Sequence, residues 1–131
     1  MKYLLDTDTV SFALRGEGRV VERIRGQPAT DLRVSAITVA ELRFGADLRK
    51  SNRLHKLIEA FTMGVRPLPV DERVARRYGL LATSLQRHGQ VIGNFDCLIA
   101  AHALAEGLTL VTHNQRHFGR IRGLKLEDWY A

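Results

Sequence analysis

Short apolar segments alternate with segments of helical character along the whole chain, and no other feature constrains its fold as strongly. The segments typical of β-strands are residues 3–5, 32–37, 65–70 and 108–112, with a short fifth at 125–126. The segments typical of helices are residues 10–14, 20–24, 38–48, 54–61, 71–88 and 94–106. Strands that alternate with helices form a parallel sheet covered on both faces. We therefore expect an α/β fold with one central, mostly parallel sheet of four to five strands, flanked by helices on both faces.

The composition is typical of one folded domain. The 131 residues fit a single domain, and 45% of them are hydrophobic, which is enough for a sizeable core. The only cysteine, Cys97, leaves no internal disulfide and no Cys-rich zinc site. Asp6 ends the first apolar run too early for a secretory signal, and no run reaches the roughly 18–20 residues of a membrane span. We expect a single domain over residues 1–131, located in the cytoplasm, with no membrane contact.

The charge balance indicates a polyanionic partner. Lys and Arg outnumber Asp and Glu by 20 to 14, a formal net charge of +6. Such an excess is typical of proteins that bind nucleic acids, although net charge says nothing of the fold. Arg73, Arg76 and Arg77 cluster on the long helical segment 71–88. This cluster is either a solvated face or a contact with RNA, and the sequence leaves both readings open.

Three acidic residues follow or adjoin the ends of expected strands. Asp6 follows the first strand, Glu41 lies just after the second, and Asp96 opens the most apolar helix. In parallel α/β sheets, ligands bind beside the carboxyl ends of the strands. We therefore expect these three carboxylates to gather at one edge of the sheet.

Each of these acids also has a purely structural explanation. Asp6 could cap the following helix. Glu41 stands three residues after Thr38, the spacing of a capping box. Asp96 would interact favourably with the dipole of a helix capped by Asn94.

Carboxylates that converge repel one another unless a cation holds them. Oxygen ligands without clustered Cys or His favour Mg²⁺ or Mn²⁺ over Zn²⁺. Such metals activate a water and stabilise the charge that develops during phosphodiester hydrolysis. A basic surface would bring the polyanion to the site. The residues thus favour a metal-dependent phosphodiesterase acting on a nucleic acid.

Six short segments, in this order, carry a resemblance to a known family. They are LLDTD at residues 4–8, ITVAEL at 37–42, IGNFD at 92–96, LIAAHAL at 98–104, VTHN at 111–114 and LKLEDW at 124–129. Together they resemble the motifs of PIN-domain ribonucleases and, more narrowly, of the VapC toxins of type II toxin–antitoxin systems. The resemblance covers essentially the whole chain and implies the PIN-domain fold.

The resemblance also implies an activity and a site. It implies a toxic Mg²⁺-dependent endoribonuclease, with Mn²⁺ as a substitute, that cuts structured RNA such as tRNA or rRNA and so inhibits translation and growth. Asp6, Glu41 and Asp96 match the catalytic, metal-binding acids of the family. Asn114 occupies a place where the family often has a fourth acid, and we include it among the catalytic residues. His117 stands where many relatives have an acid before phenylalanine.

The partners implied by the resemblance are an RNA substrate and a cognate VapB-type antitoxin encoded beside the gene. The antitoxin would inhibit through its carboxyl-terminal segment, covering helices near residues 10–24 and 54–61. A toxin homodimer and a higher toxin–antitoxin assembly are also implied.

Some of these residues also allow other interpretations. His113 and His117 have the spacing of a helical zinc pair, but no glutamate accompanies them and they follow a strand. We expect Cys97 and His102 to be core residues rather than a nucleophile and a ligand. Asp8 could help to hold a second metal, and Thr112 could orient a ligand or a water. The rival from another class is a non-catalytic basic module that binds RNA.

Overall fold

The computed structural model describes all residues 1–131. The chain forms five strands, seven α-helices and one 3₁₀ helix. Their bounds are β1 (Tyr3–Leu5), α1 (Thr7–Arg15), α2 (Val20–Arg25), η1 (Ala29–Asp31), β2 (Leu32–Ser35), α3 (Ala36–Leu48), α4 (Asn52–Gly64), β3 (Arg66–Leu68), α5 (Glu72–Arg87), α6 (Asn94–Glu106), β4 (Thr109–Val111), α7 (Gln115–Phe118) and β5 (Leu126–Glu127).

The five strands form one sheet in the order β3-β2-β1-β4-β5, and every neighbouring pair is parallel. The chain begins in the middle with β1, adds β2 and β3 on one side, and then adds β4 and β5 on the other. The order of the strands therefore reverses around β1, where α/β proteins place their ligands. The expected α/β fold with a central parallel sheet is confirmed.

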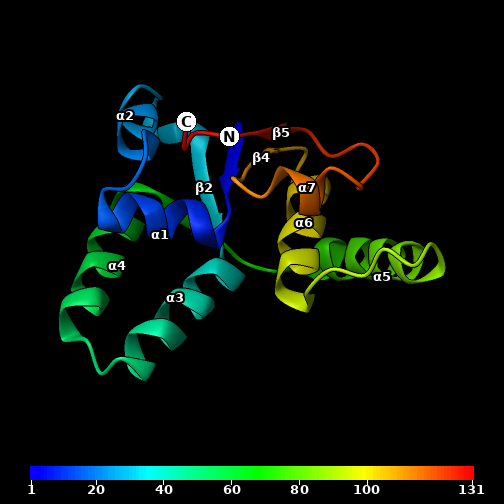
Figure 1. Ribbon diagram of the computed structural model, residues 1–131, viewed down its shortest axis with the longest axis horizontal. Helices are drawn as coiled ribbons and strands as arrows, with labels where there is room; N and C mark the ends of the chain where they lie inside the picture. The colour runs from blue at the N-terminus through cyan, green and yellow to red at the C-terminus, as the bar shows by residue number, and fades with distance from the viewer.

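Both faces of the sheet are covered, as Figure 1 shows, with α1 to α4 on one side and α5 to α7 on the other. Along β1, Tyr3 and Leu5 enter one buried cluster, and Leu4 enters the opposite one. This alternation is the two-residue period of a strand. Helices α1 to α4 cover the first cluster, whereas α5 and α6 cover the second. The burial of both faces explains why the strand segments read as nearly continuous apolar runs.

The helix α6 lies at the centre of the fold, as its apolar sequence indicates. Six of its residues are buried, and it packs extensively against α5. It ends at Gly107, whose φ of 67° is the left-handed conformation that glycine adopts at helix ends. The other end of α6 carries Asp96 in its first turn. The burial of this helix therefore fixes where that carboxylate lies.

One expected helix start and two expected caps are wrong. The strand β2 ends at Ser35, not at residue 37, because the Ser35 hydroxyl accepts a hydrogen bond from the Ile37 backbone N–H and caps α3. Thr38 is therefore inside the helix, and the expected capping box with Glu41 is absent. The helix α6 begins at Asn94, as expected, but Asn94 is not its cap, because Gly93 holds the cap position and makes no side-chain hydrogen bond.

Two helices near the site also differ from the expectation. The helix α1 begins at Thr7, three residues early, because Asp6 caps it. The short helix α7 was not expected at all, since four residues are too few to show a periodic pattern. No helix is long and apolar enough to cross a membrane.

Candidate active site

Asp6 lies at the carboxyl end of the central strand β1 and is 3% exposed. Its side chain accepts a hydrogen bond of 2.8 Å from the Thr9 backbone N–H and so caps α1. Burial raises the pKa of Asp6 to about 6, although hydrogen bonds from Thr112 and Thr9 oppose the shift. The cap and a role in the site are thus compatible. A buried carboxylate with so high a pKa lacks a countercharge, which is the situation that a bound cation relieves.

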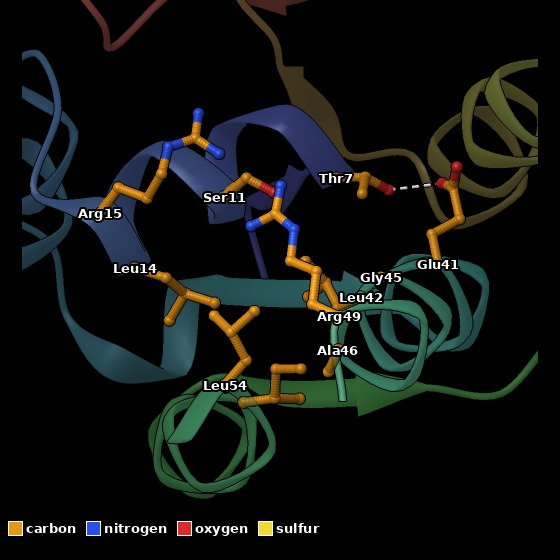
Figure 2. A pocket seen from close by; sticks show the side chains of 11 residues that line it. Thr7, Ser11, Leu14, Arg15, Glu41, Leu42, Gly45, Ala46, Arg49 and Leu54 are labelled. Carbon is orange, nitrogen blue, oxygen red and sulfur yellow. Dashed lines mark hydrogen bonds between the residues drawn. The ribbon is translucent and has the colours of Figure 1, made fainter. Parts of the chain in front are cut away.

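Glu41 projects from the second turn of α3, one turn later than its expected place. The Thr7 hydroxyl donates a hydrogen bond of 2.6 Å to Glu41 Oε1, and Thr7 Oγ1 also lies 3.1 Å from the hydroxyl of the buried Thr38. Figure 2 shows Thr7 and Glu41 facing each other across the gap between α1 and α3. Partial burial raises the pKa of Glu41; the hydrogen bond from Thr7 opposes this rise, and the negative charge of Asp96 adds to it. Thr7 therefore fixes the orientation of this carboxylate.

Asp96 lies in the first turn of α6 and is half-buried. Burial raises its pKa, and the neighbouring His117 opposes the rise. His117 Nε2 lies 3.8 Å from Asp96 Oδ2 and is a buried atom with no hydrogen-bond partner. Glu41 and Asp96 line one hollow of about 400 Å³, whose remaining wall is the start of α6.

Asp8 connects the three acids electrostatically. It is exposed in the first turn of α1, and its charge contributes to the raised pKa of Asp6, of Glu41 and of Asp96. No three His, Cys, Asp or Glu side chains converge closely enough, as they stand, to hold a metal ion. The donor set nevertheless fits a hard divalent cation in kind, because it consists of partly or fully buried carboxylates whose pKa values are raised by neighbouring negative charge.

Asn114 lies at the edge of this arrangement. Its side chain caps α7 by accepting a hydrogen bond of 3.3 Å from the His117 backbone N–H. Its own backbone N–H donates a hydrogen bond of 3.0 Å to the hydroxyl of Thr112, whose side chain also opposes the raised pKa of Asp6. Asn114 itself forms no hydrogen bond with an acid of the site.

The two histidines of the possible zinc pair point to different surroundings. His113 Nδ1 lies 2.9 Å from Asp128 Oδ2, and its ring stacks on Tyr130 with the centroids 4.4 Å apart. His117 faces Asp96 instead, so the structure gives no zinc pair. The ring of His117 is half-buried.

The two residues expected in the core, Cys97 and His102, are both buried but differ in their hydrogen bonding. Cys97 is buried in the cluster under α5 and α6, and burial raises its pKa. His102 is fully buried, and its Nδ1 lies 2.8 Å from the Ser35 hydroxyl that caps α3. Its Nε2 has no partner, so His102 is only half satisfied. Burial lowers the pKa of His102.

Sequence reasoning missed Thr7 and placed too little weight on Asp8 and His117. The signal for Thr7 and Asp8 was present, because both adjoin Asp6 at the end of a buried strand. The contact of His117 with Asp96 spans 21 positions and depends on α7, which no periodic pattern indicated.

Comparisons with known proteins agree with this fold. The pattern of the PIN domain family matches residues 3–124. The chain is 36% identical over 130 residues to the ribonuclease VapC2 of Haemophilus influenzae, and 33% identical over 130 residues to the tRNA(fMet)-specific endonuclease VapC of Shigella flexneri. Each alignment covers 98% of both chains. The crystal structure of DNA-bound VapBC from Salmonella typhimurium contains a chain with a TM-score of 0.91 and 34% identity, over 98% of both chains. This protein therefore belongs to the PIN-domain family and, within it, to the VapC ribonucleases.

Proposed function

We propose that this protein is a metal-dependent endoribonuclease that acts as the toxin of a type II toxin–antitoxin system. The observation that carries the proposal is the acidic edge of the sheet, meaning Asp6, Glu41 and Asp96, whose pKa values are all raised by burial and by the negative charge of neighbouring carboxylates. Membership of the VapC ribonucleases supports the same reaction class. The chain as a whole, residues 1–131, forms the catalytic domain.

The metal is Mg²⁺, with Mn²⁺ as a substitute, and Asp6, Glu41 and Asp96 are its ligands. When bound, the ion supplies a Lewis acid that activates a water and stabilises the charge of the reacting phosphate. Other residues of the chain hold the ligand side chains in place. Thr7 holds Glu41 through its hydroxyl, and the Thr9 backbone N–H holds Asp6. Asn114 keeps the turn after β4 in place by capping α7.

The metal dependence is tested by incubating purified protein with labelled tRNA in Mg²⁺, in Mn²⁺ and in EDTA. The Asp96→Asn variant is the control for a contaminating nuclease. We expect cleavage by the wild type only when the metal is present, and none by the variant. Metal-independent cleavage, or binding of RNA without any cleavage, would contradict the proposal, and the second outcome would favour the non-catalytic RNA-binding module.

The substrate is a structured RNA, such as tRNA or rRNA, and its cleavage inhibits translation and growth. The Shigella flexneri relative is named for specificity toward tRNA(fMet), which supports a tRNA as the first candidate. Sequencing of RNA ends after a brief pulse of expression identifies the cleavage site. We expect new ends within a few defined loops, which are absent from cells expressing Asp96→Asn. Ends spread at random over messenger RNA would contradict a structured target.

The inhibitor is a cognate VapB-type antitoxin, as in the VapBC complex of Salmonella typhimurium. A groove of about 130 Å³ between α1, α3 and α4 suits its carboxyl-terminal segment. Leu14, Leu42 and Leu54 line it, and Glu41 lies at one end, as Figure 2 shows. Apolar side chains of the segment would fill the groove and a basic side chain would reach Glu41.

Co-purified antitoxin should suppress cleavage, and a Leu14→Arg toxin should escape suppression. A complex that cuts RNA as fast as free toxin would contradict this mode of inhibition.

The toxin forms a homodimer within a larger toxin–antitoxin assembly. Phe44 and Phe95 are large, exposed and line one hollow together with Glu41, so an apolar surface adjoins the acidic edge. Exposed apolar surface of this kind is typical of an interface. Sedimentation of the free toxin should give twice the monomer mass, and Phe44→Glu should give the monomer mass. A wild-type monomer at all concentrations would contradict the dimer.

A further inference from the structure

A second hollow lies away from the acidic edge, between the end of α5 and the segment that follows α7. Its volume is about 340 Å³. The buried side chains of Leu85 and Ile121 form its floor. Polar and basic side chains form its rim, and they are Ser84, His88, Gln90, Arg120 and Arg122. We call this hollow the basic cleft.

The charge around the basic cleft is not balanced by acids of the protein. From Gly107 to Leu126 the chain has no Asp or Glu, but it has four Lys and Arg residues. Arg120 and Arg122 form no ion pair, and neither does Arg87 at the end of α5. By contrast, Arg15, Arg19, Arg73 and Arg76 each pair with a carboxylate. An unbalanced basic hollow attracts an anionic ligand.

The two arginines are held in place by the core between them. Ile121 is 5% exposed and belongs to the same buried cluster as Phe118 and Leu85. The Ile121 backbone N–H donates a hydrogen bond of 3.1 Å to the Phe118 carbonyl, which anchors the turn to α7. Arg120 and Arg122 therefore project from a fixed stretch of main chain and not from a free loop. Guanidinium groups bind phosphate oxygens through paired N–H donors.

The basic cleft is close enough to the acidic edge for one RNA molecule to reach both. His117 lies 3.8 Å from Asp96, and Arg120 follows His117 by three residues. Three residues span at most about 11 Å of extended chain. An RNA strand with a phosphate beside Asp96 would thus carry its neighbouring nucleotides toward Arg120.

We propose that the basic cleft binds backbone phosphate of the RNA substrate next to the scissile position. The inference rests on the proposed function and deepens it. Arg120 and Arg122 supply the phosphate contacts, and Ser84 and Gln90 add neutral polar groups at the rim. The cleft selects RNA that is long enough to extend beyond the metal site, and it reads no base sequence.

The test measures binding of fluorescently labelled tRNA to the Asp96→Asn protein across a KCl series. The double variant Arg120→Ala with Arg122→Ala should bind roughly tenfold more weakly, and the slope of log affinity against log salt should fall by about 1 to 2. The matched control is Arg19→Ala with Arg76→Ala, which removes the same charge from arginines that are already paired. It should lose less than about twofold, because its charges are neutralised by Glu22 and Glu72.

Three outcomes would overturn the inference. The first is a double variant that binds tRNA as tightly as the parent. The second is an equal loss in the control pair, which would mean that only net charge matters. The third is unchanged RNA binding with lost antitoxin binding, which would assign the cleft to a protein partner.

Circular dichroism and thermal melting exclude misfolding, and Arg120→Lys with Arg122→Lys should retain most of the binding. Failure of the proposed function is distinguishable, because then the wild type does not cut RNA in Mg²⁺.

Discussion

The substitution Asp6→Asn should inactivate the protein and at the same time stabilise it. Asn is as good a helix cap as Asp, so the bond from the Thr9 N–H is retained. What changes is the buried charge. The pKa of Asp6 is about 6 in the folded protein against an ordinary value of 3.8. Because one pKa unit corresponds to about 1.4 kcal/mol, ionised Asp6 costs about 3 kcal/mol of stability at pH 7. The amide avoids that cost.

The pH dependence of this difference has a defined sign. A carboxyl group whose pKa is raised on folding imposes no cost below its unfolded pKa, and imposes the whole cost above its folded pKa. The gain in stability of Asp6→Asn over the wild type should therefore be near zero below pH 4. It should grow between pH 4 and pH 6 and stay constant above that. Urea unfolding in EDTA at pH 4 to 8 measures it.

Added Mg²⁺ should reduce the difference in stability between Asp6→Asn and the wild type. A ligand that binds only the folded state stabilises it by about 1.4 kcal/mol at ten times its dissociation constant. The wild type should gain this stability, and Asp6→Asn should not. The matched control is Asp71→Asn at the cap of α5, where the Val74 N–H and Arg73 lower the pKa of the carboxyl group. That variant should be less stable than the wild type over the whole range of pH 4 to 8, because the contribution of a carboxyl group with a lowered pKa is lost only below its ordinary value of 3.8. Equal stability of Asp6→Asn and wild type at pH 7 would refute the reasoning.

Two further predictions concern the residues around the metal ligands. Thr7→Val should lower kcat/KM roughly tenfold and move the acid limb of the pH–rate profile to higher pH, because Glu41 loses a hydrogen bond that stabilises its charge. Thr7→Ser should restore both properties, and Ser11→Ala in the same groove should change neither. An acid limb that does not move in Thr7→Val would contradict the role of Thr7. Asn114→Asp should lower the Mg²⁺ concentration needed for half-maximal cleavage, because it adds a negative charge and preserves the cap of α7. Asn114→Ala should lose less activity than a variant that lacks any of the three acids. An unchanged Mg²⁺ titration for Asn114→Asp would show that position 114 is not the fourth ligand position.

The sheet and its acidic edge were predictable from the sequence because they depend on short-range pattern. Buried strands read as apolar runs, and parallel strands end at one edge, so Asp6 and the start of α3 had to lie near each other. The start of α3 itself was not predictable to the residue. Ser35 and Thr38 are both good caps, and local sequence does not decide which of the two is used.

The contacts that orient the acids could not be predicted in the same way. Thr7 and Glu41 are 34 positions apart, and whether their side chains meet depends on how α1 and α3 pack. The same holds for His117 and Asp96, which meet only because α7 folds back over the start of α6. Such contacts depend on side-chain direction, which tertiary packing sets and local sequence does not.

The distribution of charge separates binding of RNA from its cleavage. Four of the 14 Asp and Glu residues, namely Asp6, Asp8, Glu41 and Asp96, lie at the candidate site, so ten remain to balance 20 Lys and Arg on the rest of the molecule. A polyanion is thus attracted to the protein as a whole and repelled from the acidic edge until cations neutralise it. The metal-free protein should retain RNA through its basic surface and leave it intact. Retention in EDTA is therefore expected of the nuclease as well as of a binding module, and only metal-dependent cleavage distinguishes the two.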